Sequence, residues 1–108
     1  MKPVVYTKLA EREIEAAAVF FEGRKEGLGV QFYERIDQAK RKVERNPDGF
    51  QKIYKDMCHV NLEQFKEWGL FFRIRDDGAI VIACMSGKRH PSLKHERASG
   101  AVPIKPKP

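Results

Sequence analysis

The sequence has little of what would place a protein in a membrane or fix its fold by covalent links. It has only two cysteines in 108 residues, and no apolar run approaches the roughly 20 residues of a membrane span. The first residues pass directly into charged sequence, without the apolar core of a signal peptide. We therefore expect a cytoplasmic protein in which Cys58 and Cys84 are reduced core thiols rather than a disulfide.

Motifs for metal or phosphate binding are also missing. His59 next to Cys58, and His90 with His95, do not have the usual spacing of zinc ligands. The glycines between residues 23 and 29 fall between two expected helices, whereas a phosphate-binding loop follows a strand. We therefore expect neither a metal nor another cofactor.

Positive charge is concentrated at the C-terminal end of the chain. Residues 1–87 hold 15 Lys and Arg against 14 Asp and Glu, a net charge of +1. Residues 88–108 hold six basic residues against one acidic residue, a net charge of +5. Such a field attracts polyanions, either nucleic acid or an acidic protein, although a solvated tail that aids solubility has the same composition.

The N-terminal half predicts a strand followed by two helices. Residues 3–6 have the pattern of a short strand, and Thr7 is a suitable N-cap for a helix over residues 8–22. A second apolar stripe, with spacings of three and four residues, predicts a helix over residues 28–45. The sequence NPDG at residues 46–49 ends it. The short link between the helices predicts an antiparallel hairpin.

The C-terminal half predicts three strands in succession. Residues 59–65 alternate between apolar and polar, and this strand is expected to pair with the next one, over residues 68–75. An Asp-Asp-Gly turn at residues 76–78 then leads to a strand over residues 79–85, which is apolar on both faces. Residues 50–57 have no clear period and are expected to be irregular.

These elements predict an α+β fold of order β-α-α-β-β-β, in which an antiparallel sheet packs on the helical hairpin. Residues 1–97 are expected to form a single domain. Residues 98–108 hold three of the six prolines and have no periodicity. They are predicted to be a flexible basic tail.

The last strand leads into a basic turn, Ser86-Gly87-Lys88-Arg89-His90-Pro91. An apolar strand, an Asp-Asp-Gly turn, a strand rich in Val and Ile, and this basic turn resemble the end of toxins in the RelE/ParE superfamily. Residues 27–47 look like that family's second helix. The resemblance covers residues 4–97 and implies the same fold. It also implies a bacterial toxin of a type II toxin–antitoxin, or plasmid stabilisation, system that inhibits growth.

One branch of this family cleaves messenger RNA on the ribosome. RNA cleavage needs a base, an acid, and cations for the phosphate charge. The candidate catalytic residues here are Lys88, Arg89, His90 and His95. The resemblance implies that Arg89 is the catalytic arginine of the turn, and it places His95 where those members have a tyrosine. It puts Gly69 at a second catalytic arginine, so one cation is missing unless Arg73 reaches the same face. An enzyme of this kind would be a metal-independent endoribonuclease.

The ParE-like branch inhibits DNA gyrase by binding it and has no comparable catalytic set. Phe72-Arg73 matches a Tyr-Arg pair of that branch, and the basic turn keeps its glycine, both cations and its proline. This pattern favours a gyrase inhibitor over a ribonuclease, an inactive toxin relative or a plain RNA-binding module. The residues expected to bind the target are Arg73, Lys88, Arg89, Lys94 and Arg97.

An antitoxin is the other expected partner. Phe71 and Phe72 are adjacent in a strand and must point to opposite faces of the sheet. If the helices cover one face only, the second aromatic residue is left for a partner. With the basic C-terminal end, this predicts an acidic antitoxin that contacts Trp68, Phe71 and Phe72. Packing of these side chains in the core is the alternative.

Overall fold

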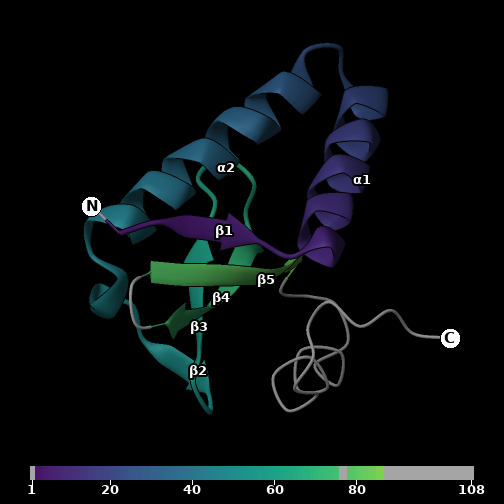
Figure 1. Ribbon diagram of the computed structural model, residues 1–108. Helices are drawn as coiled ribbons and strands as arrows, with labels where there is room; N and C mark the ends of the chain where they lie inside the picture. Colours follow the sequence, from purple (N-terminus) through teal and green to yellow (C-terminus); the bar gives the residue numbers. More distant parts are fainter. Residues whose placement is uncertain (1, 76–77, 87–108) are drawn as a thin grey trace, which may run out of the picture.

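Two helices lie on one side of a five-stranded sheet in the computed structural model of the chain (Figure 1). The structure describes residues 2–75 and 78–86. Its strands are β1 (Val4–Tyr6), β2 (Lys52–Tyr54), β3 (Met57–Asn61), β4 (Trp68–Arg75) and β5 (Gly78–Ser86). Its helices are α1 (Lys8–Arg24), α2 (Leu28–Arg45) and the short 3-10 helix η1 (Pro47–Gly49). The predicted α+β class is confirmed, with one strand more than expected.

The helical hairpin forms where the apolar stripes predict it. Thr7 caps α1, because its Oγ1 accepts a hydrogen bond of 3.0 Å from the Ala10 N–H. α2 begins and ends at the predicted residues, whereas α1 continues past its predicted end through Gly23 to Arg24. Neither helix, nor any other in the described ranges, is long and apolar enough to cross a membrane.

One carboxylate fixes the link between α1 and α2. Glu22 accepts hydrogen bonds from the Gly27 N–H at 2.9 Å and from the Gly29 N–H at 2.8 Å. These bonds favour the ionised form and hold the pKa of Glu22 below its usual value. Gly27 has a φ of 89°, a left-handed conformation that glycine adopts without strain. The N-terminus of α2 is thus capped by a side chain of the preceding helix.

The sheet has the order β1-β5-β4-β3-β2. The first strand pairs parallel to the last one, and every other neighbouring pair is antiparallel. The register between β4 and β5 shifts between Phe71, which pairs with Ala83, and Phe72, which pairs with Val81. This bulge leaves Ile82 as an extra residue in β5.

Residues 50–57 are the part of the fold that the sequence did not predict. They include β2, which pairs with β3 through a two-residue turn at Lys55 and Asp56. Lys55 has a φ of 51°, in the left-handed region that such turns use. In addition, β3 ends at Asn61, so that a loop replaces the second half of the strand predicted over residues 59–65. Leu62 and Phe65 of this loop are buried in the core.

The main core lies between the helices and the sheet. Four aromatic rings pack together at one end of it, with centroids 4.8 to 5.8 Å apart: Phe21, Phe32, Phe65 and Trp68. Cys58 and Cys84 both belong to the main core, where they are buried free thiols, as predicted. Burial raises the pKa of the Cys58 thiol. Full burial of one large apolar side chain contributes about 1.5–3 kcal/mol to stability.

Candidate functional site

The predicted site residues fall into two groups. Six of them lie outside the described residues, so that their roles stay predictions: Lys88, Arg89, His90, Lys94, His95 and Arg97. The tail predicted over residues 98–108 also lies outside. The other predicted site residues, Trp68, Phe71, Phe72 and Arg73, all lie on β4, in the middle of the sheet.

Phe71 and Phe72 point to opposite faces of the sheet, as predicted. Phe72 belongs to the core beneath the helices, and its ring packs edge-on against Phe50. Phe71 belongs to a second cluster, on the face opposite the helices, with Met57, Ile82, Ala83 and Met85. We call this the second face.

The prediction that one of these aromatic residues is left open is wrong. Phe71 is 2% exposed and Phe72 is fully buried. Trp68 is half-buried and packs against Phe21 and Phe32 on the helical side. The core packing considered as the alternative therefore accounts for the burial of Phe71 and Phe72, and contact between these residues and an antitoxin stays a prediction.

Arg73 lies on the second face, where its guanidinium is held in place. Its Nε donates a hydrogen bond of 3.0 Å to Oδ1 of Asp56, in the β2–β3 turn. The residue is only 5% exposed, whereas the Asp56 side chain is 57% exposed. An arginine that is buried and ion-paired cannot turn to a phosphate without breaking that pair. The structure therefore gives Arg73 a role in joining β4 to the β2–β3 turn.

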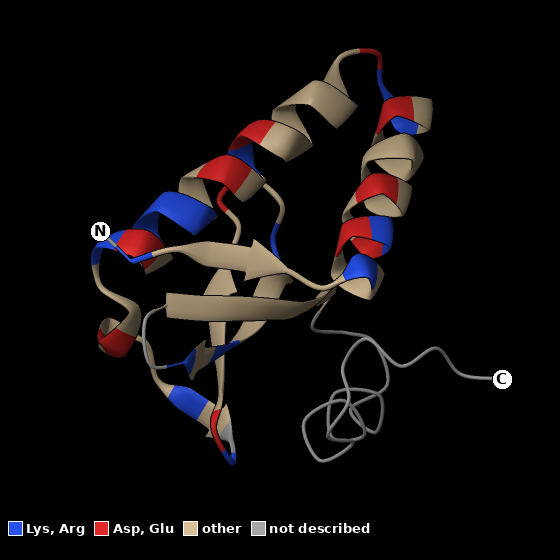
Figure 2. Ribbon diagram, in the orientation of Figure 1, with Lys and Arg blue, Asp and Glu red and all other residues tan. Residues whose placement is uncertain are grey.

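The described residues at this end of the sheet carry an excess of positive charge. Among them, four basic residues lie on the β2–β3 hairpin and the end of β4, around the carboxylate of Asp56: Lys52, Lys55, Arg73 and Arg75. The sequence continues from Arg75 into Asp76 and Asp77, which lie outside the described ranges. Figure 2 shows basic positions along this hairpin and at the neighbouring end of β4. We call this group the basic end. Its exposed cations, Lys52, Lys55 and Arg75, attract acidic groups of a partner or of nucleic acid.

His59 is a candidate residue that the sequence did not identify. It was considered only as a metal ligand beside Cys58, but it pairs with Phe71 across the β3–β4 ladder. Its ring lies 4.5 Å from that of Phe71, on the second face. His59 is the one histidine among the described residues, and its Nε2 is buried on this face. His59 reaches the face that holds Arg73 through the pairing register of β3 and β4, and this register is not visible in the local sequence.

The backbone of Gly69 lies close to the His59 ring, because glycine has no side chain to keep them apart. A Cβ at this position would be 2.3 Å from Nε2 of His59 and 2.5 Å from the carbonyl oxygen of Val60. Both distances are far shorter than a van der Waals contact. The position at which the family resemblance expects an arginine therefore has no room for any side chain.

Within the described ranges, no group of three or more His, Cys, Asp or Glu is placed to hold a metal ion. No protein-family model and no curated protein matches this chain. The geometry of the second face and of the basic end is thus the basis on which function can be argued.

Proposed function

We propose that this protein is the toxin of a type II toxin–antitoxin pair, and that it acts by binding DNA gyrase. The observation that carries the proposal is the fold: the helical hairpin and the antiparallel strands that follow it agree with the α+β architecture that the RelE/ParE resemblance implies, whereas the parallel pairing of β1 and the additional strand β2 go beyond it. The proposal places the protein in the bacterial cytoplasm, where both gyrase and an antitoxin are accessible.

The geometry of β4 supports binding over RNA cleavage. A phosphate site for cleavage needs cations that can turn toward the developing charge. Arg73 is buried against Asp56, and Gly69 has no space for an arginine. Neither Gly69 nor Arg73 therefore supplies the missing catalytic cation. A binding inhibitor has no such requirement, since a fixed basic surface is sufficient to attract an acidic target.

The test is a pulse-labelling experiment. The protein would be induced in bacterial cells, and incorporation of labelled thymidine and methionine would be followed from the first minutes. We expect DNA synthesis to stop first, and purified protein to inhibit supercoiling by gyrase. If protein synthesis stops first, with unchanged gyrase activity, the proposal is refuted.

A ribosome-dependent endoribonuclease is the second candidate, and His59 is the observation that favours it. This residue adds a titratable group to the face that holds Arg73. Removing a general acid or base typically costs about 10²–10⁴-fold in rate. Cleavage of ribosome-bound message that is lost in His59→Ala or His95→Ala, at unchanged folding, would select this candidate.

The proposal also includes an acidic antitoxin. Its docking surface is not an open aromatic strand, because Phe71 and Phe72 are both buried. The basic end and the predicted basic turn are the surfaces that match its charge. Co-purification with the product of the neighbouring gene tests this partner, and the absence of a complex at micromolar concentration contradicts it.

A further inference from the structure

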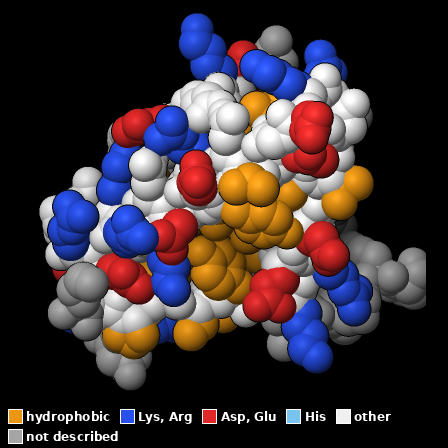
Figure 3. Space-filling view, turned by 90° about the horizontal axis from the view of Figure 1, so that it is seen from above, with side chains coloured by type: hydrophobic (Ala, Val, Ile, Leu, Met, Phe, Trp, Pro, Cys, Tyr) orange, Lys and Arg blue, Asp and Glu red, His pale blue; other side chains and the backbone are white. Residues whose placement is uncertain are grey.

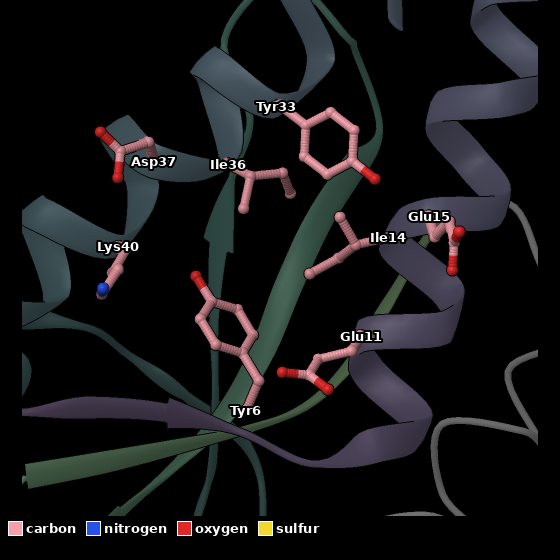
Figure 4. A pocket seen from close by; sticks show the side chains of 8 residues that line it. All are labelled: Tyr6, Glu11, Ile14, Glu15, Tyr33, Ile36, Asp37 and Lys40. Atoms are coloured by element: carbon pink, nitrogen blue, oxygen red, sulfur yellow. The ribbon is translucent and has the colours of Figure 1, made fainter. Parts of the chain in front are cut away.

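A cavity of about 430 Å³ lies between the two helices and β1. Its volume is within the range of ligand pockets, about 300–1,000 Å³. Figure 4 shows Tyr6 from β1, Ile14 from α1, and Tyr33 and Ile36 from α2 around this space. Figure 3 shows it as an open hollow with hydrophobic side chains in the middle and acidic ones at the rim.

The charge at the rim of this cavity is negative. Three carboxylates and one ammonium group line it: Glu11, Glu15, Asp37 and Lys40. Two of these groups already have partners on α2, since Lys40 pairs with Glu44 at 3.9 Å and Asp37 pairs with Arg41. No hydrogen bond or ion pair joins the carboxylates of Glu11 and Glu15 to another described residue. Lys40 is the one described cation that lines the cavity with them.

Glu11 and Glu15 are also one helical turn apart on α1. Like charges at this spacing repel each other and destabilise a helix. The two carboxylates nevertheless both line the cavity. A cation bound between them would relieve this repulsion, and no described basic side chain forms an ion pair with either carboxylate.

The tyrosine rings provide a second feature that suits a cation. The faces of aromatic rings attract ammonium and guanidinium groups, and the attraction is larger where water is excluded. Tyr33 is 48% exposed, whereas Tyr6 lies deeper, and burial together with the charge of Asp37 raises the pKa of Tyr6 to about 12. The deep tyrosine therefore stays neutral and lies in the field of a carboxylate at the rim.

The surface continues beyond this cavity. A second hollow of about 420 Å³ shares Tyr33 and Asp37 with it and extends along α2 to Val30, which is 62% exposed. Two adjoining open hollows suit an extended chain better than a small molecule, which is usually enclosed. The occupant is thus expected to bring an apolar side chain beside its cation.

We propose that this interhelical cavity binds an arginine or lysine side chain presented by a segment of a partner protein. The cation lies between the carboxylates of Glu11 and Glu15 and the tyrosine rings, and the neighbouring apolar residue covers Val30. This inference does not depend on the proposed toxin function, since it concerns the chemistry of the cavity alone.

The test uses two peptides that differ only in charge. Acetyl-Leu-Arg-Leu-amide and its citrulline counterpart have nearly the same shape, and citrulline is neutral. Each would be titrated into the isotope-labelled 108-residue protein and followed by NMR. We expect the arginine peptide to shift the signals of Ile14, Tyr33 and Ile36, with a dissociation constant in the millimolar range. The citrulline peptide should bind about tenfold more weakly.

Variants show whether the cavity is responsible. Glu11→Gln combined with Glu15→Gln should weaken binding of the arginine peptide about threefold to tenfold, in line with exposed ion pairs. Tyr33→Leu, which keeps an apolar side chain, should weaken it about twofold to fivefold. The matched control is Glu26→Gln, because Glu26 is an exposed carboxylate of the same hairpin outside the cavity. Circular dichroism would check that each variant is folded.

The proposal is overturned if the two peptides bind with equal affinity, or if the shifts are confined to other parts of the protein. It is also overturned if the control loses as much affinity as the double variant. The absence of any shift at about 10 mM peptide would overturn it as well.

Discussion

Replacing Gly69 by alanine should lower the free energy of unfolding of this protein substantially, although it adds only one methyl group. The added Cβ would lie 2.3 Å from Nε2 of His59 and 2.5 Å from the carbonyl oxygen of Val60. The His59 ring can rotate, but Val60 is backbone of β3, which pairs with β4 through five residue pairs. The two strands must therefore separate locally. Overpacking of this kind costs typically 1–3 kcal/mol, and sometimes more, so we expect about 3 kcal/mol.

The same substitution at Gly23 is the matched control. Gly23 lies in α1, and a Cβ there would meet nothing within 4 Å. Alanine should stabilise this position by about 0.5–1 kcal/mol, because glycine is the poorer helix former. Urea unfolding would measure both free energies, and a difference of 1 kcal/mol corresponds to about 4–8 °C in melting temperature.

The double variant Gly69→Ala, His59→Ala separates the two contacts. It should recover only part of the loss, since the clash with the Val60 carbonyl remains. If Gly69→Ala lies within about 0.5 kcal/mol of the unaltered protein, the effect is that of an ordinary surface change and our account of this position fails.

Three further predictions concern the helix caps and the basic turn. Thr7→Ala should lower the free energy of unfolding by about 1 kcal/mol, because the α1 cap is lost. Thr7→Ser keeps the hydroxyl and should retain most of that free energy. Equal losses in the two variants, measured by urea unfolding, would contradict the role of Thr7 as the cap. Because folding lowers the pKa of Glu22 from 4.5, its contribution to stability is present above that pH and is lost as pH falls through the folded value. Acid titration of stability should therefore be flatter in Glu22→Gln, and an unchanged profile would argue against this cap. The double change Lys88→Ala, Arg89→Ala should abolish growth inhibition with little change in melting temperature, and undiminished toxicity in the induction assay would refute the role of this turn.

The helices were predictable from the sequence because their signals are local. An apolar stripe, a capping threonine and a terminating proline act within one or two turns of the chain. They placed α2 at its observed bounds and the cap of α1 at Thr7. The predicted end of α1 was less accurate, because Gly23 weakens the helix without ending it. The Glu22 side chain also accepts hydrogen bonds from the start of the next helix.

The strand β2 escaped prediction because it is only three residues long, too short to show a period. It forms because β3 provides a partner through a tight turn, which is a tertiary effect. The bulge at Phe71 and Phe72 has a similar origin. Alternation predicted that these rings face opposite ways, but the sequence contains no signal for the register shift to β5.

The candidate site depended still more on long-range pairing. Arg73 could be identified from the sequence as a cation of β4, but not as one side of an ion pair with Asp56, 17 residues earlier. The same holds for His59, whose place beside Phe71 and Gly69 follows from the register of two strands. Sequence reasoning found which residues carry charge, and the sheet determines which of those charges can reach a ligand.

The basic end and the interhelical cavity differ in the sign of their described charge, and this difference affects which ligand can bind where. The basic end lies at the β2–β3 hairpin, whereas the carboxylates of the cavity lie between the helices (Figures 1 and 2). An acidic partner is attracted to the first surface and repelled by the second, and a basic segment has the reverse preference. Charges farther apart than about 10 Å are largely screened at physiological salt, so each surface acts on its own ligand. The toxin proposal and the cavity proposal can therefore fail separately, because neither surface contributes to the binding expected at the other.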